Sequence, residues 1–498
     1  GVGAAEFVAS GTLPNGAPVV LKADGTVVTA APTVTQIAES IPAGSEHVFN
    51  AGSTAQIIAA FDPNNADKFV VVYQDESNSS YGTAVVGTVS GTTISFGTNV
   101  IFDSSGYIGN PTLAFDPNLS GKFVVAYQFG AVGYSLLGTL SGTSVSFGTR
   151  VAFSSSGTSE PSIAFDSYNS GKFVIAYYKS AGKAIVGTIS GTTLTYGTEV
   201  EWSAQATREP KIAFDPNTAG SFVIQYRNSS TSSRGAVMAG TLTGTSLSFG
   251  TENVYTTGYS NGDFAFDPNT ANKFVMAYRS QDISYNGAVR VGTISGTTIS
   301  LGTEVVFNNS NTQYTSVAFD TSAANKFVIA YWDATTGNAI VGTVSGTSVS
   351  FATEILFNAG YTKFNQVIFN PNTSGKFVIV HEDDSNSDYG TAIVGQMAAT
   401  VSTPNLTSTN FLGTSTAAYT NAQTATIMLQ GGVSTNQTGL TVGSTYYVQQ
   451  DGTLSTTAGT PSVEAGKALS ATSLFLSDPV DQTAAQIKAA YEGEASAF

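Results

Sequence analysis

Short apolar segments alternate along most of this chain with polar turn sequences, and one such arrangement is repeated. Each copy contains an Ala-Phe segment, a turn related to Asp-Pro-Asn, an apolar segment such as Lys172 to Tyr177, and a hairpin with a Ser-Gly-Thr turn. β-Branched and aromatic residues favour strands, whereas Asp, Pro and Gly favour tight turns. The Phe near the start of each copy recurs every 49 to 54 residues, at Phe61, Phe115, Phe165, Phe214, Phe266, Phe319 and Phe369.

This period, with four predicted strands in each copy, is typical of a β-propeller blade. We therefore predict an all-β chain with a seven-bladed β-propeller over residues 36–397. The seventh copy starts near Tyr361 and lacks its fourth strand, but Gly44 to Asn50 matches the fourth-strand sequence Gly302 to Asn308. The N-terminal strand should therefore complete the seventh blade and close the ring, which leaves no open sheet edge between the first and last blades.

The segments on either side of the repeats predict smaller units. Residues 1–35 form a short β segment that we expect to pack beside the ring. Residues 398–408 are rich in Thr, Ser, Pro and Asn, which predicts a linker, and residues 409–477 predict a small β domain. Residues 478–498 predict a helical tail whose apolar positions recur at spacings of three and four. That apolar stripe would either dock on its own domain or mediate self-association.

Composition narrows the class of protein. Hydrophobic residues make up 41% and charged residues 11%, which is too apolar for a disordered chain. The formal net charge is −15 with no basic run, so nucleic-acid binding is excluded. No apolar run reaches the roughly 20 residues that span a bilayer, so no membrane segment is predicted. Cysteine is absent, which removes disulfides, thiol nucleophiles and thiolate metal sites.

The two histidines fall at positions that are structural in the other copies. His47 lies in the closing strand, where the matching residue of another copy is Val305. His381 takes the place of a second-strand tyrosine that the other copies carry. We interpret both as packing residues and predict no catalytic triad, no metal site and no cofactor. The tyrosines at the position of His381 are Tyr73, Tyr127, Tyr177, Tyr226, Tyr278 and Tyr331.

The acidic and basic residues do not indicate an enzyme. Nearly every copy carries an aspartate at the turn position, so these residues define the repeat, whereas catalytic carboxylates would depart from it. The six arginines come from different blade positions, and the S-x-D-x-G-x-x-W sequence of sialidases is missing. Residues 75–79 and 382–388 form two acidic loops, but they lack the Gly and terminal Glu of an EF-hand loop, which favours solvated loops over Ca²⁺ sites.

The two faces of the predicted disc differ in their connections. Because strand direction alternates, the first-to-second and third-to-fourth turns share one face, and their sequences are nearly uniform. The second-to-third loops and the connections between copies share the other face, which we call the variable face. Tyr and Trp among small polar residues are typical of binding loops, although unconstrained drift explains them equally well. The candidate ligand-binding residues are Tyr107, Tyr178, Arg227, Tyr259, Arg279, Tyr285, Tyr314, Trp332 and Tyr361.

The segments after the repeats resemble a known class of proteins. GGVSTNQTGLTVGSTYYVQQDGTLST and VEAGKALSATSLFL resemble a small β domain of tail-fibre and other structural proteins of tailed bacteriophages. DPVDQTAAQIKAAYEGEASAF is similar to a helical connector of phage fibres. The repeat also resembles propeller repeats of virion proteins, particularly from marine phages. The resemblance implies a virion protein that is exposed to the extracellular medium, and it brings no catalytic residues.

We therefore expect a virion fibre or appendage component that displays a propeller for adhesion to a host-surface glycan or protein receptor, and we do not expect an enzyme. The expected partners are other virion proteins and further copies of the chain, as a trimer through the C-terminal region. The alternatives are an architectural capsid-decoration or spacer protein, and a propeller hydrolase that acts on host polysaccharide.

Overall fold

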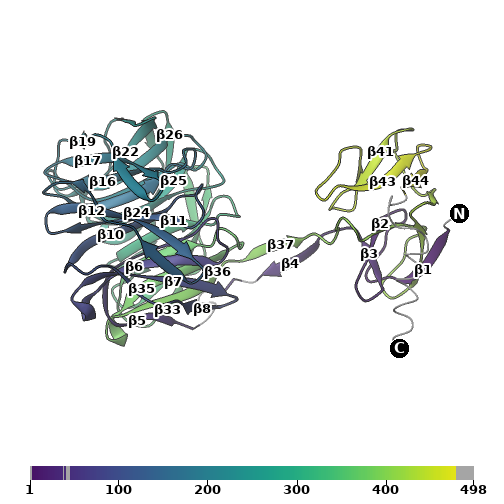
Figure 1. Ribbon diagram of the computed structural model, residues 1–498, viewed down its shortest axis with the longest axis horizontal. Helices are drawn as coiled ribbons and strands as arrows, with labels where there is room; N and C mark the ends of the chain where they lie inside the picture. The colour runs from purple at the N-terminus through teal and green to yellow at the C-terminus, as the bar shows by residue number, and fades with distance from the viewer. Residues whose placement is uncertain (1–2, 38, 41–44, 478–498) are drawn as a thin grey trace. The chain divides into compact units, whose positions relative to one another are not determined.

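The computed structural model describes residues 3–37, 39–40 and 45–477, and nearly all of its regular structure is β-strand (Figure 1). The all-β prediction is confirmed. The chain divides into a repeat unit, Ala38–Ala399, and a terminal unit, Gly1–Ile37 with Thr400–Phe498. The predicted helical tail, residues 478–498, lies outside the described residues. In the described part of the chain, no helix is long and apolar enough to cross a membrane.

Each copy of the sequence repeat forms an antiparallel sheet whose strands follow one another along the chain. The first strands are β5 (His47–Phe61), β10 (Ile108–Phe115), β15 (Ser159–Phe165), β20 (Thr207–Phe214), β24 (Asn253–Phe266), β29 (Gln313–Phe319) and β34 (Thr362–Phe369). The second strands are β6 (Lys68–Asp75), β11 (Lys122–Phe129), β16 (Lys172–Tyr178), β21 (Ser221–Asn228), β25 (Lys273–Ser280), β30 (Lys326–Trp332) and β35 (Lys376–Asp383). The third strands are β7 (Tyr81–Ser90), β12 (Val132–Ser141), β17 (Gly182–Ser190), β22 (Arg234–Thr243), β26 (Asn286–Ser295), β31 (Gly337–Ser345) and β36 (Tyr389–Gln396).

The fourth strand of a copy is divided into two short strands. In the first copy, β8 (Thr93–Phe96) and β9 (Val100–Asp103) both pair with β7. The break falls at Gly97, where a Cβ would overlap the backbone carbonyl of Thr143 in the next copy. Close approach of the neighbouring backbone therefore requires glycine at this position of the first copy. The corresponding strands are β13 (Ser144–Phe147), β14 (Val151–Ser154), β18 (Thr193–Tyr196), β19 (Val200–Ser203), β23 (Ser246–Phe249), β27 (Thr298–Leu301), β28 (Val305–Asn308), β32 (Ser348–Phe351) and β33 (Ile355–Asn358).

Two long strands continue from one copy into the next. The first part of β24 pairs with β22, and its second part pairs with β25. In the same way, β5 pairs with β36 of the last copy and then with β6 of the first copy. In this register Val48 lies opposite Thr391, and Ala60 lies opposite Val70. The N-terminal strand therefore pairs with the third strand of the last copy.

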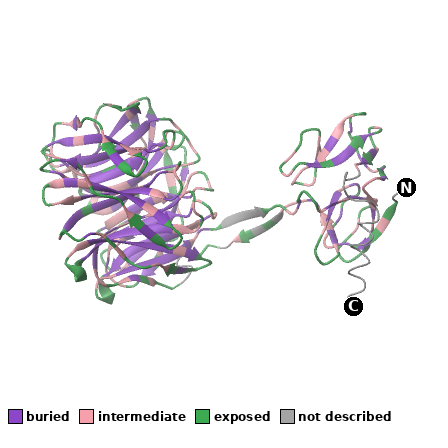
Figure 2. Ribbon diagram, viewed as in Figure 1, coloured by how far each residue is buried: buried purple, intermediate pink, exposed green. Residues whose placement is uncertain are grey.

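The core of the repeat unit consists of aromatic and β-branched side chains on the second strands, and exposed residues gather at the turns (Figure 2). In the third copy Phe173 and Tyr177 are fully buried, and the ring of Phe165 packs 5.2 Å from that of Phe173. Gly187 lies against the Phe173 ring, where a Cβ would overlap it. Burying one such phenylalanine stabilises the fold by about 1.5–3 kcal/mol.

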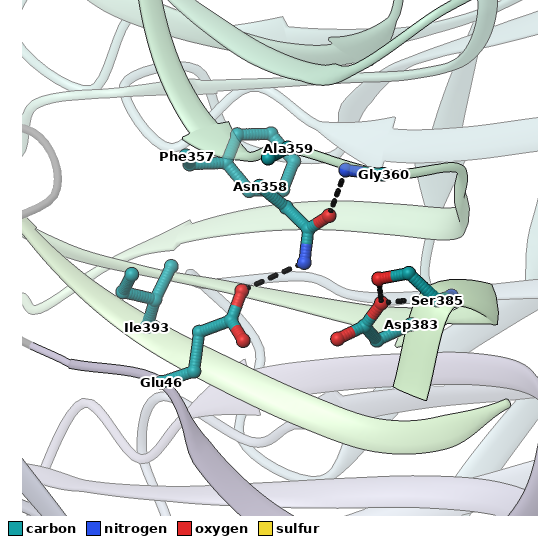
Figure 3. Close-up of a pocket in the computed structure, with 8 residues that line it drawn as sticks. All are labelled: Glu46, Phe357, Asn358, Ala359, Gly360, Asp383, Ser385 and Ile393. Atoms are coloured by element: carbon teal, nitrogen blue, oxygen red, sulfur yellow. Dashed lines mark hydrogen bonds between the residues drawn. The ribbon is translucent and has the colours of Figure 1, made fainter. Parts of the chain in front are cut away.

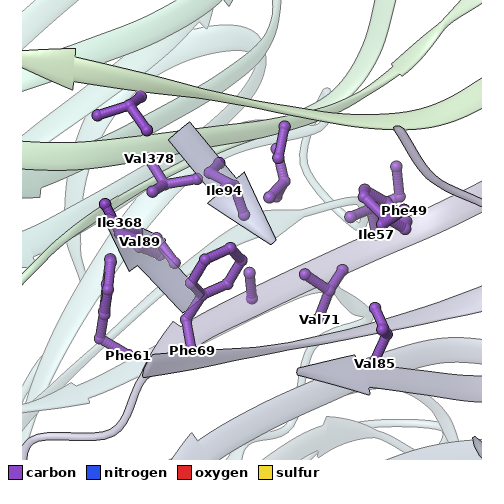
Figure 4. Packing of buried hydrophobic residues seen from close by; sticks show 14 of the residues in the cluster. Phe49, Ile57, Phe61, Phe69, Val71, Val85, Val89, Ile94, Ile368 and Val378 are labelled. Carbon is purple, nitrogen blue, oxygen red and sulfur yellow. The ribbon is translucent and has the colours of Figure 1, made fainter. Parts of the chain in front are cut away.

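One core cluster joins the first copy to the last. Phe61, Val71 and Val85 of the first copy are buried together with Ile368 and Val378 of the last copy (Figure 4). Clusters of the same kind join other neighbouring copies. The apolar faces of neighbouring sheets therefore pack against each other. Because the strands are covered on both faces, their sequences are nearly continuous apolar runs.

The repeated aspartates are buried turn residues, as predicted, and they also connect neighbouring copies. Asp116 Oδ1 accepts a hydrogen bond from the backbone N–H of Asn118, at 2.8 Å. Its Oδ2 accepts a second one from the N–H of Gly171 in the next copy, at 2.7 Å. The same bond between copies joins Asp215 to the N–H of Asn272 and Asp267 to the N–H of Asn325. Each such carboxylate therefore fixes its own turn and the position of the next one.

The terminal unit contains two antiparallel sheets. The strands of the first sheet, in spatial order, are β1 (Ala4–Val8), β39 (Thr424–Leu429), β38 (Phe411–Ser415), β2 (Pro18–Leu21) and β3 (Val27–Thr29). Those of the second are β40 (Val433–Ser434), β44 (Leu474–Leu476), β43 (Val463–Ala468), β41 (Thr445–Val448) and β42 (Leu454–Ser455). A further pair is formed by β4 (Thr33–Ile37) and β37 (Ala399–Thr403).

These pairings correct the predicted boundaries of the flanking segments. Residues 1–35 were expected to form a separate segment beside the ring, yet β1 pairs with β39 and β2 pairs with β38. Strands β1, β2 and β3 therefore share one sheet with β38 and β39, and the two segments belong to one compact unit. Part of the predicted linker, residues 398–408, is strand β37. Local patterns cannot reveal which distant strand a short β segment will pair with, and that is the source of the error.

Candidate functional site

The structure sorts the nine candidate residues of the variable face into two groups and two single residues. Arg227, Tyr259, Arg279 and Tyr285 form one group, which we call the arginine–tyrosine group. Tyr314, Trp332 and Tyr361 form the second, which we call the aromatic group. Tyr107 and Tyr178 belong to neither group.

The arginine–tyrosine group is built on adjacent strands and one short turn. Arg227 and Arg279 are the last residues but one of β21 and β25, and their guanidinium carbons lie 5.0 and 5.8 Å from the ring centre of Tyr259 on β24. Tyr285 follows the 3-10 turn η2 (Gln281–Ile283), and its ring centre lies 4.4 Å from the Arg279 guanidinium. Two arginines therefore lie close to one tyrosine, which favours cations by its negative π-face.

The two arginines of this group differ in how their charge is neutralised. Arg227 donates a hydrogen bond of 3.0 Å to the carboxylate of Glu209. Among residues 45–477, the guanidinium of Arg279 has neither a carboxylate partner nor a hydrogen bond, and its Nε is buried. Every other arginine pairs with an acid: Arg150 with Asp103, Arg208 with Glu160, Arg234 with Glu252 and Arg290 with Glu304.

The aromatic group lies at the boundary between the sixth and seventh copies, whereas the arginine–tyrosine group lies between the fourth and fifth. The ring centres of Trp332 and Tyr361 are 4.5 Å apart, and those of Tyr314 and Tyr361 are 6.3 Å apart. The indole N–H of Trp332 is buried and has no hydrogen-bond partner among the residues that the structure describes. Burial raises the pKa of Tyr314, so its phenol stays neutral. The backbone N–H of Thr312 donates to the carbonyl of Tyr285, which places the two groups in neighbouring segments.

The two remaining candidates have separate surroundings. Tyr107 is 61% exposed, and its hydroxyl accepts a hydrogen bond from Gln56 at 3.1 Å. Tyr178 lies under the guanidinium of Arg208, whose central carbon is 4.3 Å from the ring centre. Arg208 also pairs with Glu160, 3.5 Å away.

Sequence reasoning missed a set of residues on the first strands. Five residues before the repeated phenylalanine, the backbone has a positive φ in most copies, for example 51° at Glu209 and at Phe364. These residues sit at β-bulges, which redirect side chains. The Glu160 carboxylate accepts the N–H of Glu209 at 2.7 Å. Their fixed offset from the phenylalanine is a signal that could have found them. The missed residues are Gln56, Asn110, Glu160, Glu209 and Phe364, and the set also includes Tyr314, which was already a candidate.

A second polar site lies where the N-terminal segment meets the last copy. Glu46, Phe357, Asn358 and Asp383 line a cavity of about 500 Å³ (Figure 3). His381, on β35, is fully buried, and its Nε2 lies 3.7 Å from Glu46 Oε1. The imidazole of His381 and the amide of Asn358 together hold the pKa of Glu46 below its ordinary value, despite partial burial.

A single lysine pairs with all three carboxylates of the neighbouring acidic cluster. The Lys363 ammonium lies 2.6 Å from Glu382, 3.0 Å from Asp384 and 3.3 Å from Asp388. Burial, only partly offset by Lys363, raises the pKa of Glu382 to about 7. Burial opposes a charge on Lys363 as well, but its hydrogen bond to Glu382 raises the pKa of the ammonium. The cluster is thus an internal salt-bridge network, and its single cation site is already filled by Lys363.

Comparison with known proteins gives a likeness of fold only. No family model matches the chain, and no curated protein matches it. Chaetomium thermophilum Sqt1, solved bound to the N-terminus of the ribosomal protein L10, is 11% identical with a TM-score of 0.46; the match covers 68% of this chain and 84% of that one. A chain of a mitotic checkpoint complex is 9% identical with a TM-score of 0.45, over 74% and 93% of the two chains. Both are WD40-like β-propeller proteins.

These findings contradict the predicted function. The matched structures named above are not phage tail fibres, so the prediction of a virion fibre or appendage component is corrected and set aside. The two alternatives, capsid decoration and polysaccharide hydrolysis, have no support either, and neither do virion partners or a trimer. The sequences on which the resemblance to phage proteins was based are rich in Gly, Ser and Thr turns. Many β proteins share such turns, so these sequences indicated a β fold but not a function.

Proposed function

We propose that residues 38–399 form a closed seven-bladed β-propeller that serves, without catalysis, as a binding module for a protein partner. The contacts of the first strands support closure. β5 contacts β10, and successive first strands contact one another up to β34, which contacts β5 again. The pairing of β5 with β36 adds the fourth strand to the last copy. A closed propeller has no free sheet edge at this point.

Polar contacts between the last and first copies also support closure. The Asn370 side-chain amide donates a hydrogen bond of 2.6 Å to Asp67 Oδ1. Thr373 donates a further one to the same oxygen, at 3.3 Å. These bonds occupy the position that aspartate-to-backbone bonds occupy between other copies.

The observation that carries the binding proposal is the free charge of Arg279. A guanidinium that is stacked on Tyr285, near Tyr259, and has no carboxylate of its own is pre-organised to receive one. The partner would supply that carboxylate as an aspartate or glutamate side chain. The aromatic group beside it would accept an apolar side chain. Trp, Tyr and Arg are the residues that dominate the binding energy of protein interfaces.

A peptide selection tests this proposal. A random-sequence peptide display library is panned on the immobilised full chain, and enriched peptides are synthesised for fluorescence polarisation. We expect them to carry Asp or Glu beside an aromatic or aliphatic residue. Arg279→Gln should weaken their binding by roughly 10- to 100-fold, because a charge-assisted hydrogen bond contributes about 1.5–3 kcal/mol.

The matched control is Lys172→Gln. It removes the same charge from a lysine whose ammonium donates to the turn carbonyl of Gly244, away from both groups. This variant should bind the selected peptides as the parent chain does. Enrichment without acidic residues, or equal affinities for Arg279→Gln and Lys172→Gln, would overturn the proposal.

A further inference from the structure

His381 is the most unusual polar residue of the repeat unit. Its side chain is fully buried, and neither ring nitrogen has a hydrogen-bond partner among the described residues. At the same position in the third to sixth copies a tyrosine hydroxyl donates to a glutamate, as Tyr278 does to Glu304 at 2.6 Å. Glu46 is the corresponding glutamate for His381, but the 3.7 Å separation is too long for a hydrogen bond. A buried, unsatisfied nitrogen costs about 1–3 kcal/mol, so it calls for a ligand.

We propose that Glu46, His381 and Asp383 bind a divalent transition-metal ion of the zinc class. The potential ligand atoms of the three side chains all lie within 4.8 Å of one another. In a tetrahedral zinc site with bonds of about 2.1 Å, ligand atoms lie roughly 3.4 Å apart, so the side chains need to close by at most about 1.4 Å. One imidazole with two carboxylates suits zinc better than calcium or magnesium, which take oxygen ligands alone.

The surrounding residues orient the two carboxylates. Asn358 donates a hydrogen bond of 2.8 Å to Glu46 Oε1, and its own Oδ1 accepts the N–H of Gly360 at 2.7 Å. Ser385 donates from its N–H and its hydroxyl to Asp383 Oδ1. The other oxygens of Glu46 and Asp383 receive none of these hydrogen bonds, and Figure 3 shows both carboxylates beside the same cavity. Such supporting hydrogen bonds are typical of metal ligands.

The imidazole is held in place as well. The ring of Phe357 lies 5.2 Å from that of His381 and covers one side of it. The cavity of about 500 Å³ leaves room for water as a further ligand. A metal ion at this point would join the segment that precedes β5 to β35 of the last copy. It would therefore stabilise the contact between the two ends of the repeat unit.

Binding of zinc to the full chain, without a histidine tag, tests this proposal. The chain is treated with EDTA, dialysed and titrated with ZnCl₂ in a calorimeter, and its thermal unfolding is followed with and without the ion. We expect one Zn²⁺ per chain and a rise of a few degrees in the unfolding temperature, because an ion that binds the folded state alone stabilises it.

The matched control is His381→Tyr, which installs the tyrosine of the other copies. This variant should fold, since the tyrosine can reach Glu46 as Tyr278 reaches Glu304, but it should neither bind zinc nor gain stability from it. Asp383→Asn should weaken zinc binding at least tenfold. Zinc binding that persists in His381→Tyr, no binding by the parent chain, or an equal stabilisation by CaCl₂ would each overturn the proposal.

Discussion

At the boundary between the second and third copies, Asp116 accepts a hydrogen bond from the backbone N–H of Gly171. At the boundary between the last and first copies the roles are reversed, because Asn370 donates from its side chain to Asp67. Asn370 is the amide among seven equivalent turn residues that are otherwise aspartates, and Asp67 is the acid at a position that is otherwise Gly or Asn. The two exceptions meet each other. Both residues must therefore be considered together, since changing one alone would leave two carboxylates or two amides in contact.

The comparison extends to the second strands. Tyr177, Tyr226 and Tyr278 each donate a hydrogen bond to a glutamate of the same copy, at 2.5, 2.6 and 2.6 Å. The last and first copies, which meet at β5, depart from this pattern, and so does the second copy, where Tyr127 donates to Asp103 of the first copy. Tyr73 of the first copy has a buried hydroxyl without a hydrogen-bond partner in the described part of the chain, and the last copy has His381. The apolar core is continuous across this boundary, so the differences are confined to polar contacts. One boundary of a repeat array can therefore have its own polar contacts, such as that between Asn370 and Asp67, while the apolar core is the same as at the other boundaries.

The largest loss of stability is expected from a glycine-to-alanine substitution that should affect the last copy and the third copy equally. Gly395→Ala in the last copy and Gly187→Ala in the third would each place a Cβ inside a buried phenylalanine ring, Phe377 and Phe173 respectively. We expect each to lower the free energy of unfolding by about 3 kcal/mol, because overpacking forces rings and backbone apart. Urea unfolding of both variants measures this. A much smaller loss for Gly395→Ala would mean that the last copy is packed more loosely than the third.

The second prediction tests the reversed hydrogen bond. Asn370→Asp should destabilise the chain by about 2 kcal/mol, since it replaces a donor with a carboxylate that faces Asp67 in a buried turn. The double variant Asn370→Asp with Asp67→Asn recreates the Asp267–Asn325 pair and should recover most of that loss. Thermal and urea unfolding give both values. If the double variant is no more stable than Asn370→Asp alone, the two residues do not act as a pair.

The smallest effect concerns the tyrosine hydroxyls. Tyr278→Phe removes a hydrogen bond to Glu304 and should cost about 1 kcal/mol. Tyr73→Phe removes a hydroxyl that has no partner and should leave stability unchanged or raise it slightly. The difference between the two variants, measured by urea unfolding in the same buffer, should therefore be about 1 kcal/mol. Equal losses would show that the Tyr73 hydroxyl has a partner in solution.

The strands and turns of the repeat unit could be predicted because the same sequence pattern recurs in each copy. The repeated Asp-Pro-Asn turn and the apolar second strand are local patterns, and the structure contains both. The requirement for glycine at position 97 could not be predicted, since it depends on the backbone of Thr143 in the next copy. The pairing of β1 with β39 was missed for the same reason: its partner is distant in sequence.

The residues of the candidate site could be named from the sequence, but which of them lie together could not be predicted. The sequence pointed to Arg227 and Arg279 equally, yet only tertiary structure reveals that Glu209 neutralises the first and leaves the second free. For His381, the alignment of copies already placed Glu46 opposite it, as Glu304 is opposite Tyr278. The proximity of His381 and Glu46 could therefore have been inferred from the sequence, but the burial of both imidazole nitrogens could not. That the nine candidate residues bind a ligand stays a prediction.

Strand β5 has a consequence for the order in which the chain can fold during synthesis. Its first residues, around Val48, emerge from the ribosome early, but their partner Thr391 is made only after the whole array of copies. Until then the half-strand has an unpaired edge, which is a site for incorrect pairing with another nascent chain. Docking of this half-strand is therefore a late event with high contact order, and a slow final folding step is expected from it. A chain interrupted before residue 389 would never complete that step.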